Sequence, residues 1–167
     1  MKEVRVPEER VGVLIGESGE TKKDIEELLD IDLEIKDNLA VIKGDALDER
    51  TAHRVVKAIG RGFNPEKALR LVEKDVTFHM LDITKFADTK NSEERLKGRV
   101  IGRNGETRRH LEKEGNVEIS VYGKTIGVIG YAENIHIVTE SIKMLLKGST
   151  HSTAYQYLEK NQEKIRR

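Results

Sequence analysis

A repeated segment constrains the fold of this chain more than any other feature of its sequence. Segment 12–27 aligns with segment 98–113 at an offset of 86 residues, and both contain the pattern Ile-Gly-x-x-Gly-Glu-Thr. The same offset, without a gap, places Gly44 on Gly130 and Lys57 on Lys143. A chance resemblance between two glycine-rich turns cannot hold one offset over roughly fifty residues, so we predict two copies of one structural unit.

Each copy is predicted to be a mixed α/β (α+β) unit with the element order β-α-α-β-β-α. In the first copy Ile25, Leu28 and Leu29 are expected to form the apolar face of the second helix. Hydrophobic periodicity and turn residues give the element bounds. The first copy is expected to have a strand that ends at Pro7, helices over 8–15 and from 19, strands over 31–35 and 39–42, and a helix over 46–60. The second is expected to have a strand over 75–84, helices over 92–101 and 105–114, strands over 117–121 and 125–129, and a helix over 132–146.

Two segments lie outside the repeat. Asn64-Pro65 is a helix N-cap followed by proline, which predicts a connecting helix over 65–73. Its Ala68, Leu69 and Val72 are expected to pack on a repeat. The predicted domains are therefore residues 1–62, 63–74, 75–148 and 149–167, in the order first module, connecting helix, second module and C-terminal helix.

The C-terminal segment is predicted to be a helix that docks on its own protein, with a partner-binding helix as the alternative. Ala154, Tyr155, Leu158 and Ile165 are expected to lie on its apolar face. Residues 151–153, His-Ser-Thr, are expected to cap the start of this helix.

Composition narrows the class of protein. Cysteine is absent, which excludes disulfides, cysteine-ligated zinc and a thiol nucleophile. The N-terminus lacks an apolar signal region and no stretch is long enough to span a membrane, so we expect a soluble cytoplasmic protein. The 30 Lys and Arg residues balance 30 Asp and Glu residues. A zero net charge does not exclude a nucleic-acid partner, because the position of the charges decides that.

The glycine loops are the candidate binding sites. Gly16-Glu-Ser-Gly19 and Gly102-Arg-Asn-Gly105 each separate two predicted helices. Glycine lets another backbone come close, and the helix that follows offers free N–H groups and the positive end of its dipole. Both features favour a phosphate. A single G-x-x-G between helices is weak support, but here it occurs twice in the same setting.

These loops resemble those of type I KH domains, which clamp the backbone of about four nucleotides of single-stranded nucleic acid. The resemblance implies that bases lie on an aliphatic groove, formed by the helix before the loop and the strand after the second helix. Ile101 and Ile119 hold those places in the second copy. Aromatic residues are only 4% of the chain, which disfavours a reader that stacks bases on aromatic rings.

The two loops differ in charge. Residues 97–113 carry six cations and two anions, for a net charge of +4, whereas residues 11–27 carry two cations and five anions, for −3. Because cations dominate phosphate binding, we predict that the second module binds RNA. Its predicted contacts are Lys97, Gly98, Arg99, Ile101, Gly102, Arg103, Asn104, Gly105, Arg108, Arg109 and Ile119. A weaker or structural site is predicted at Gly16, Ser18, Gly19, Lys22 and Lys23, because Glu17 stands inside that loop.

The resemblance extends beyond the loops. Segments 60–69, 96–102, 120–125 and 148–153 together resemble archaeal two-KH proteins related to eukaryotic small-subunit ribosome assembly factors. That family accompanies the endonuclease that trims the 3′ end of small-subunit rRNA. The resemblance implies single-stranded RNA as partner, in particular the 3′ region of that rRNA. It also implies contact with the endonuclease or with the α-subunit of translation initiation factor 2.

No catalytic set stands out. The segment Gly123-Lys124-Thr125 resembles the end of a P-loop, but Glu118 occupies the position that requires glycine. The five histidines are scattered, so we predict no metal, no cofactor and no enzymatic activity. Two alternatives remain open. One is a protein-interaction adaptor for a nuclease or translation factor with weak RNA binding, and the other is an RNA-processing enzyme.

Overall fold

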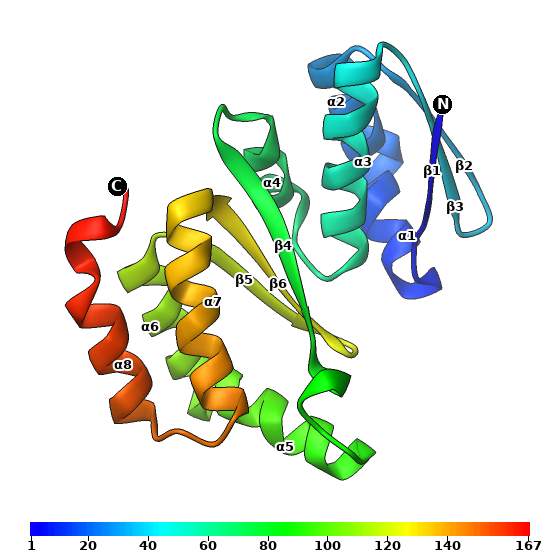
Figure 1. Cartoon of the computed structure of the whole chain (residues 1–167). Helices are drawn as coiled ribbons and strands as arrows, with labels where there is room; N and C mark the ends of the chain where they lie inside the picture. The colour runs from blue at the N-terminus through cyan, green and yellow to red at the C-terminus, as the bar shows by residue number, and fades with distance from the viewer. The chain divides into compact units, whose positions relative to one another are not determined.

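The computed structural model describes all residues from 1 to 167 and divides into two compact units, Met1–Lys74 and Asp75–Arg167. Each unit is described by itself (Figure 1). No helix in either unit is both long and apolar enough to cross a membrane.

The first unit follows the predicted element order. Its sheet has the strand order β1-β3-β2, and both pairings are antiparallel. The predicted helix over 8–15 is confirmed, and it ends at Gly16, which has a positive φ of 78°. The elements are β1 (Lys2–Arg5), α1 (Glu8–Ile15), α2 (Glu20–Leu29), β2 (Asp32–Lys36), β3 (Leu39–Lys43), α3 (Ala46–Gly60) and α4 (Pro65–Ala68), with short 3₁₀ turns η1 (Glu17–Gly19) and η2 (Leu69–Val72).

The second unit repeats this arrangement and extends it. Its sheet has the order β4-β6-β5, again antiparallel, and the pairing Ile119↔Val128 matches Leu33↔Ile42 at the 86-residue offset. The elements are β4 (Val76–Asp82), α5 (Lys90–Ile101), α6 (Glu106–Gly115), β5 (Glu118–Tyr122), β6 (Thr125–Tyr131), α7 (Ala132–Leu146) and α8 (His151–Lys160), with 3₁₀ turns η3 (Ile83–Lys85), η4 (Arg103–Gly105) and η5 (Gln162–Lys164).

One hydrophobic core holds the second unit together. Leu81, Ile126 and Val128 from the sheet pack with Val100 of α5, and with side chains of α6, α7 and α8. Because these residues share one face of the sheet, the helices cover that face.

Side-chain hydrogen bonds shift two predicted boundaries in the second unit. The predicted strand over 75–84 stops at Asp82, because its carboxylate accepts hydrogen bonds from the backbone N–H (2.9 Å) and hydroxyl (2.6 Å) of Thr84. The helix predicted to start at Ser92 begins at Lys90, because Thr89 caps it by accepting from the Ser92 N–H at 3.1 Å.

The connecting segment differs from the single helix predicted over 65–73. Asn64 caps it as expected, accepting from the Lys67 N–H at 2.8 Å. After Ala68 the backbone tightens to a 3₁₀ turn with three residues per turn, which places Leu71 on the same face as Ala68. Leu71 is therefore buried, as is Ala68, whereas Leu69 is half-buried and Val72 is exposed, so the packing predicted for Val72 was wrong.

The apolar face predicted for α2 was also too wide. Ile25 and Leu29 are buried, but Leu28 is 56% exposed. Ile25 and Leu29 are one turn apart and lie above one another, whereas Leu28 is rotated by about 100° from Leu29, to the edge of that narrow stripe.

The C-terminal segment docks on its own unit, as predicted. Ala154, Leu158 and Ile165 join the core, and α8 lies beside α7 (Figure 1). Thr150, not residues 151–153, caps α8 by accepting from the Thr153 N–H at 3.1 Å. The helix also stops earlier than predicted, at Lys160, and Tyr155 is only half-buried.

A pair of hydrogen bonds fixes the chain beyond α8. The fully buried side chain of Asn134 donates to the carbonyl oxygen of Arg166 at 2.8 Å and accepts from its N–H at 2.7 Å. The Arg166 guanidinium lies over the ring of Tyr131, 4.0 Å from its centroid. The segment after α8 is therefore part of the folded unit.

Candidate nucleic-acid interface

The loop that joins α5 to α6 depends on its two glycines. Gly102 has φ 75° and ψ 173°, and Gly105 has φ 75° and ψ 13°. A Cβ atom on Gly102 would stand 2.7 Å from the backbone nitrogen of Thr107, which is too close for any side chain. Asn104 between them also has a positive φ, of 54°, which asparagine tolerates better than most residues.

The start of α6 adjoins the glycine loop. Gly105 occupies the N-cap position, and no side chain caps the helix there. The Glu106 N–H donates to the carbonyl oxygen of Arg103 within η4, and the positive end of the helix dipole lies at this point. This arrangement suits an anion such as a phosphate.

Two arginines beside this loop are exposed and without an acidic partner. Arg103 lies within the loop, and Arg109 lies one turn into α6. The Nη1 atom of Arg109 is 2.9 Å from the place where a Cβ on Gly105 would stand, so its guanidinium is next to the loop backbone. Lys113, which is also exposed, follows Arg109 one turn later and reinforces the positive charge.

Two other cations that were predicted to contact RNA, one on α5 and one on α6, lie near carboxylates. Arg108 Nη1 lies 3.9 Å from a carboxylate oxygen of Glu112, and Lys97 Nζ lies 3.2 Å from one of Glu94. Gly98 is exposed on α5, with no atom within 4 Å of the place of a Cβ. The loop charge is thus carried mainly by Arg103 and Arg109.

The first unit has the same loop geometry with different charges. Gly16, Ser18 and Gly19 have φ angles of 78°, 54° and 75°, within a few degrees of the second loop. The lysines that follow are both in ion pairs, however. Lys22 Nζ is 3.1 Å from Glu26, and Lys23 Nζ is 4.0 Å from Glu27. Glu17 is exposed within this loop, so the backbone is repeated but the free cations are not.

The groove predicted beside the loop is only partly present. Ile101 is half-buried at the end of α5 and can form part of it. Ile119 is 2% exposed and belongs to the core, so its predicted contact with RNA is corrected here. The Ile119 N–H donates to the carboxylate of Glu112 at 3.0 Å, which holds β5 against α6. Val121, two residues along the same strand, is partly buried and offers the apolar surface that Ile119 does not.

Arg99 has a structural role that the sequence did not reveal. Its Nε donates to the carbonyl oxygen of Leu145 at 3.0 Å, and its Nη2 donates to that of Ser149. These carbonyls lie at and beyond the end of α7, so Arg99 stabilises that helix terminus instead of facing the loop. Its predicted RNA contact is corrected for this reason.

The first unit contains the same contact with a different arginine. Arg10 Nε donates to the carbonyl oxygen of Ile59 at 2.9 Å, and Arg10 Nη2 donates to that of Phe63 at 2.8 Å. Ile59 and Phe63 match Leu145 and Ser149 at the 86-residue offset, but Arg10 matches position 96 and not 99. Aligning the two copies therefore could not have shown that Arg99 binds the end of α7.

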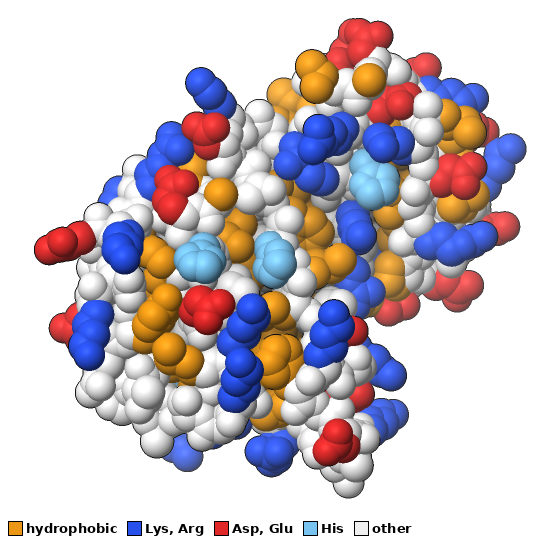
Figure 2. Space-filling model, viewed as in Figure 1, with side chains coloured by type: hydrophobic (Ala, Val, Ile, Leu, Met, Phe, Trp, Pro, Cys, Tyr) orange, Lys and Arg blue, Asp and Glu red, His pale blue; other side chains and the backbone are white.

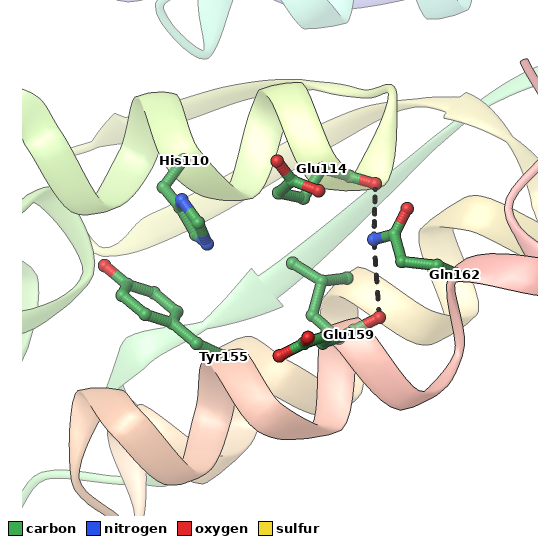
Figure 3. Close-up of a pocket in the computed structure, with 6 residues that line it drawn as sticks. His110, Glu114, Tyr155, Glu159 and Gln162 are labelled. Atoms are coloured by element: carbon green, nitrogen blue, oxygen red, sulfur yellow. Dashed lines mark hydrogen bonds between the residues drawn. The ribbon is translucent and has the colours of Figure 1, made fainter.

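His110 points away from the loop, toward α8. It lines a small pocket between α6 and α8, and its ring centroid is 4.1 Å from that of Tyr155 (Figure 3). At the other end of the pocket the Gln162 side chain donates to the carbonyl oxygen of Glu114 at 3.1 Å (Figure 3). His110 thus helps to dock α8.

Charge on the molecule as a whole is mixed. Lys and Arg side chains are interspersed with Asp and Glu over the face shown in Figure 2, which agrees with the zero net charge. The positive charge beside the second loop is therefore a local excess.

Known proteins have similar sequences and a similar fold. The family model for the eukaryotic-type KH domain (KH-domain type I), in its PNO1 form, matches residues 77–163. A KH domain-containing protein of Methanocaldococcus jannaschii is 44% identical over 170 residues, which cover 98% of this chain and 75% of that protein. The pre-rRNA-processing protein PNO1 of Gibberella zeae is 30% identical over 60% of this chain and 40% of its own length.

A solved structure gives the same result. The crystal structure of a complex of a/eIF2alpha, aDim2p and rRNA from Pyrococcus horikoshii contains a chain that superposes with a TM-score of 0.91 at 36% identity, covering 97% of this chain and 93% of that one. Sequence and fold thus agree on one family. The chain belongs to the PNO1-type KH-domain proteins, an RNA-binding family related to the PNO1 and Dim2 pre-rRNA-processing factors.

Proposed function

We propose that this protein is a non-catalytic, single-stranded RNA-binding factor in the maturation of small-subunit rRNA, built from two tandem type I KH modules. The modules are residues 1–62 and 75–148, with 63–74 as the connector and 149–167 as the C-terminal segment. The repeated element order, strand order and loop angles support two modules of one kind. The pre-rRNA-processing relatives support the role in maturation.

One observation carries the assignment of the RNA site to the second module. Its loop combines the positive end of the α6 dipole with Arg103 and Arg109, two exposed guanidiniums without acidic partners, and the first loop has no such cations. A strand of about four nucleotides clamped here would place a phosphate at the start of α6 and neighbouring phosphates within reach of the arginines. Ile101 and Val121 supply the apolar surface for the bases.

The first module serves as a weaker or structural site. Its loop has the same shape, but Glu17 opposes a phosphate and the two lysines are already in ion pairs. Breaking the partly buried pair with Glu26 reduces what Lys22 can contribute to RNA binding, whereas the exposed pair of Lys23 and Glu27 costs little to break.

The proposed partners are the 3′ region of small-subunit rRNA, the α-subunit of translation initiation factor 2 and the endonuclease that trims that rRNA. The Pyrococcus horikoshii complex, which contains rRNA and a/eIF2alpha beside a similar chain, supports the first two. The endonuclease follows from the resemblance to the assembly-factor family.

The test compares two pairs of substitutions at equivalent positions. Arg108→Ala with Arg109→Ala is expected to weaken binding of single-stranded RNA far more than Lys22→Ala with Lys23→Ala. Each phosphate contact on a single strand contributes roughly 0.7 to the slope of log affinity against log salt. The slope should fall by about 0.7 if Arg109 alone contacts a phosphate, and by about 1.4 if Arg108 leaves Glu112 to contact a second.

Affinity is measured at several salt concentrations, and thermal unfolding of each variant is followed separately. Equal losses from the two pairs, or a larger loss from the lysine pair, would contradict the assignment to the second module.

The alternative is a protein-interaction adaptor with weak RNA binding. The net charge of −3 around the first loop favours it, because such a surface suits a protein partner better than RNA. Filter binding with single-stranded RNA distinguishes the two, since an adaptor would bind RNA no more tightly than a neutral control protein does.

A further inference from the structure

A second basic site lies on the other flank of α5. A hollow of about 510 Å³ opens where η3, α5 and the end of α7 meet. Phe86, Leu96 and Leu146 form its apolar floor. Lys85, Arg95 and Lys147 line it as well, all three are exposed, and no acidic residue lines it. We call this hollow the Lys85 pocket.

Ion pairing does not account for the convergence of these three cations. The end of α7 is already satisfied, because the N–H groups of Lys147 and Ser149 donate to carbonyls of its last turns and Arg99 binds two more. None of the three cations is in an ion pair. The nearby Asp82 accepts hydrogen bonds from Thr84, which lower the pKa of its carboxyl most, and the charge of Lys85 lowers that pKa further.

We propose that the Lys85 pocket binds phosphate groups of RNA, and this proposal rests on the RNA-binding function proposed above. Three like charges around one hollow repel one another, and an anion between them removes that repulsion. The apolar lining with the half-buried Phe86 ring suits a ribose or base attached to the phosphate.

The position of the pocket separates it from the loop site. Arg95 and Lys97 are two residues apart and therefore point about 200° apart around α5, so the pocket and the groove lie on opposite flanks. Along the helix axis Arg95 is about 10 Å from Gly102. The phosphates can therefore come from two sources. They belong either to the same single strand after it passes over α5, or to a separate, double-helical part of folded rRNA.

The experiment uses the full chain and removes two charges at a time. Lys85→Gln with Lys147→Gln is compared with Lys160→Gln and Lys164→Gln, two exposed lysines of the same unit that lie outside the pocket. Affinity and salt slope are measured for a four-nucleotide RNA, a twelve-nucleotide single strand and a short RNA duplex.

The pocket variant is expected to bind the four-nucleotide RNA as the unchanged protein does, because the loop alone holds it. A slope lower by about 1.4 on the twelve-nucleotide strand identifies the same strand as the source, and a loss confined to the duplex identifies a separate helix. Either result supports the proposal if the control variant shows neither the lower slope nor the loss of duplex binding.

The proposal is overturned if the pocket variant and the control variant bind the longer strand and the duplex equally well. It is also overturned if the pocket variant only lowers the unfolding temperature, since the lysines would then act on the end of α7. Failure of the loop assignment gives a different result, in which Arg103→Ala with Arg109→Ala leaves binding of the four-nucleotide RNA intact.

Discussion

Ile101 tests whether the groove beside the second loop holds bases. It is half-buried and directly precedes Gly102, so its side chain belongs both to the fold and to the proposed groove. Ile101→Asn is expected to lower the free energy of unfolding by about 1–3 kcal/mol, because a polar group is placed in an apolar site. It is also expected to lower RNA affinity.

Ile15→Asn provides the matched control for this prediction. Ile15 holds the same half-buried place before the first loop, so its substitution should cost similar stability but leave RNA affinity nearly unchanged. Calorimetry and filter binding on both variants separate the two effects. Full affinity in a stably folded Ile101→Asn protein would refute the groove.

Arg99 is expected to matter for stability and not for RNA binding. Hydrogen bonds that involve a charged group contribute about 1.5–3 kcal/mol each, so Arg99→Ala should lower the free energy of unfolding by about 2 kcal/mol or more. The salt slope of RNA binding should not change. Urea unfolding together with salt titrations measures both, and a lower slope at unchanged stability would show that Arg99 contacts phosphate after all.

The role of a residue could be predicted only where it depends on its neighbours in the sequence. The two glycines of each loop were singled out from their spacing between two helices, and all four have a positive φ. The burial of Ile119 and the orientation of Arg99 were not predictable. Both depend on segments far along the chain, such as Glu112 beside Ile119 and Leu145 beside Arg99.

At the scale of elements, a carboxylate joins α2 to β2. Glu26 accepts from the Leu33 N–H at 3.0 Å and pairs with Lys22. Burial raises the pKa of Glu26, but the Leu33 hydrogen bond and Lys22 together outweigh it, so the pKa lies below its ordinary value of 4.5. Glu112 makes the matching contact with Ile119 in the second unit.

This lowered pKa predicts a pH dependence. A carboxyl whose pKa is depressed in the folded state stabilises the protein above its unfolded pKa and loses that contribution as the pH falls through its folded pKa. Glu26→Gln should therefore destabilise the first unit near neutral pH, and the difference from the unchanged protein should shrink as the pH falls below about 4.5.

Glu27→Gln is the matched control, because Glu27 is exposed and has no backbone partner. Chemical unfolding between pH 3 and pH 7 gives the comparison. A stability difference for Glu26→Gln that stays constant over this range would contradict the prediction.

Element order and most boundaries followed from hydrophobic periodicity. The helices over 8–15, 46–60 and 132–146 were predicted at their observed ends, since glycine or a change of period marks those ends. The segment after Ala68 was not, because four residues are too few to show whether the period is 3.6 or 3.

For the whole molecule, the central prediction is that loop shape is shared and loop charge decides RNA binding. Glu17→Arg with Glu27→Lys copies Arg103 and Lys113 into the first unit and changes the charge of residues 11–27 from −3 to +1. In a protein whose second loop carries Arg103→Ala and Arg109→Ala, these changes should restore part of the lost RNA affinity and of the salt slope.

The same two changes made as Glu17→Gln and Glu27→Gln serve as the control, since they remove anions without adding cations. Restoration should be smaller in this control. If the arginine and lysine changes restore nothing, shape and charge together are insufficient, and the first unit lacks another part of the binding surface.

The two arginines that bind the ends of α3 and α7 also record how the halves of this chain diverged. The same pair of carbonyls is bound through the same two guanidinium nitrogens, yet the donor residue differs by one helical turn. What the two halves share is therefore the pair of carbonyls at the helix end and not one arginine position. The second half could not simply take an arginine at position 96, because Leu96 is 3% exposed and lies in the hydrophobic core.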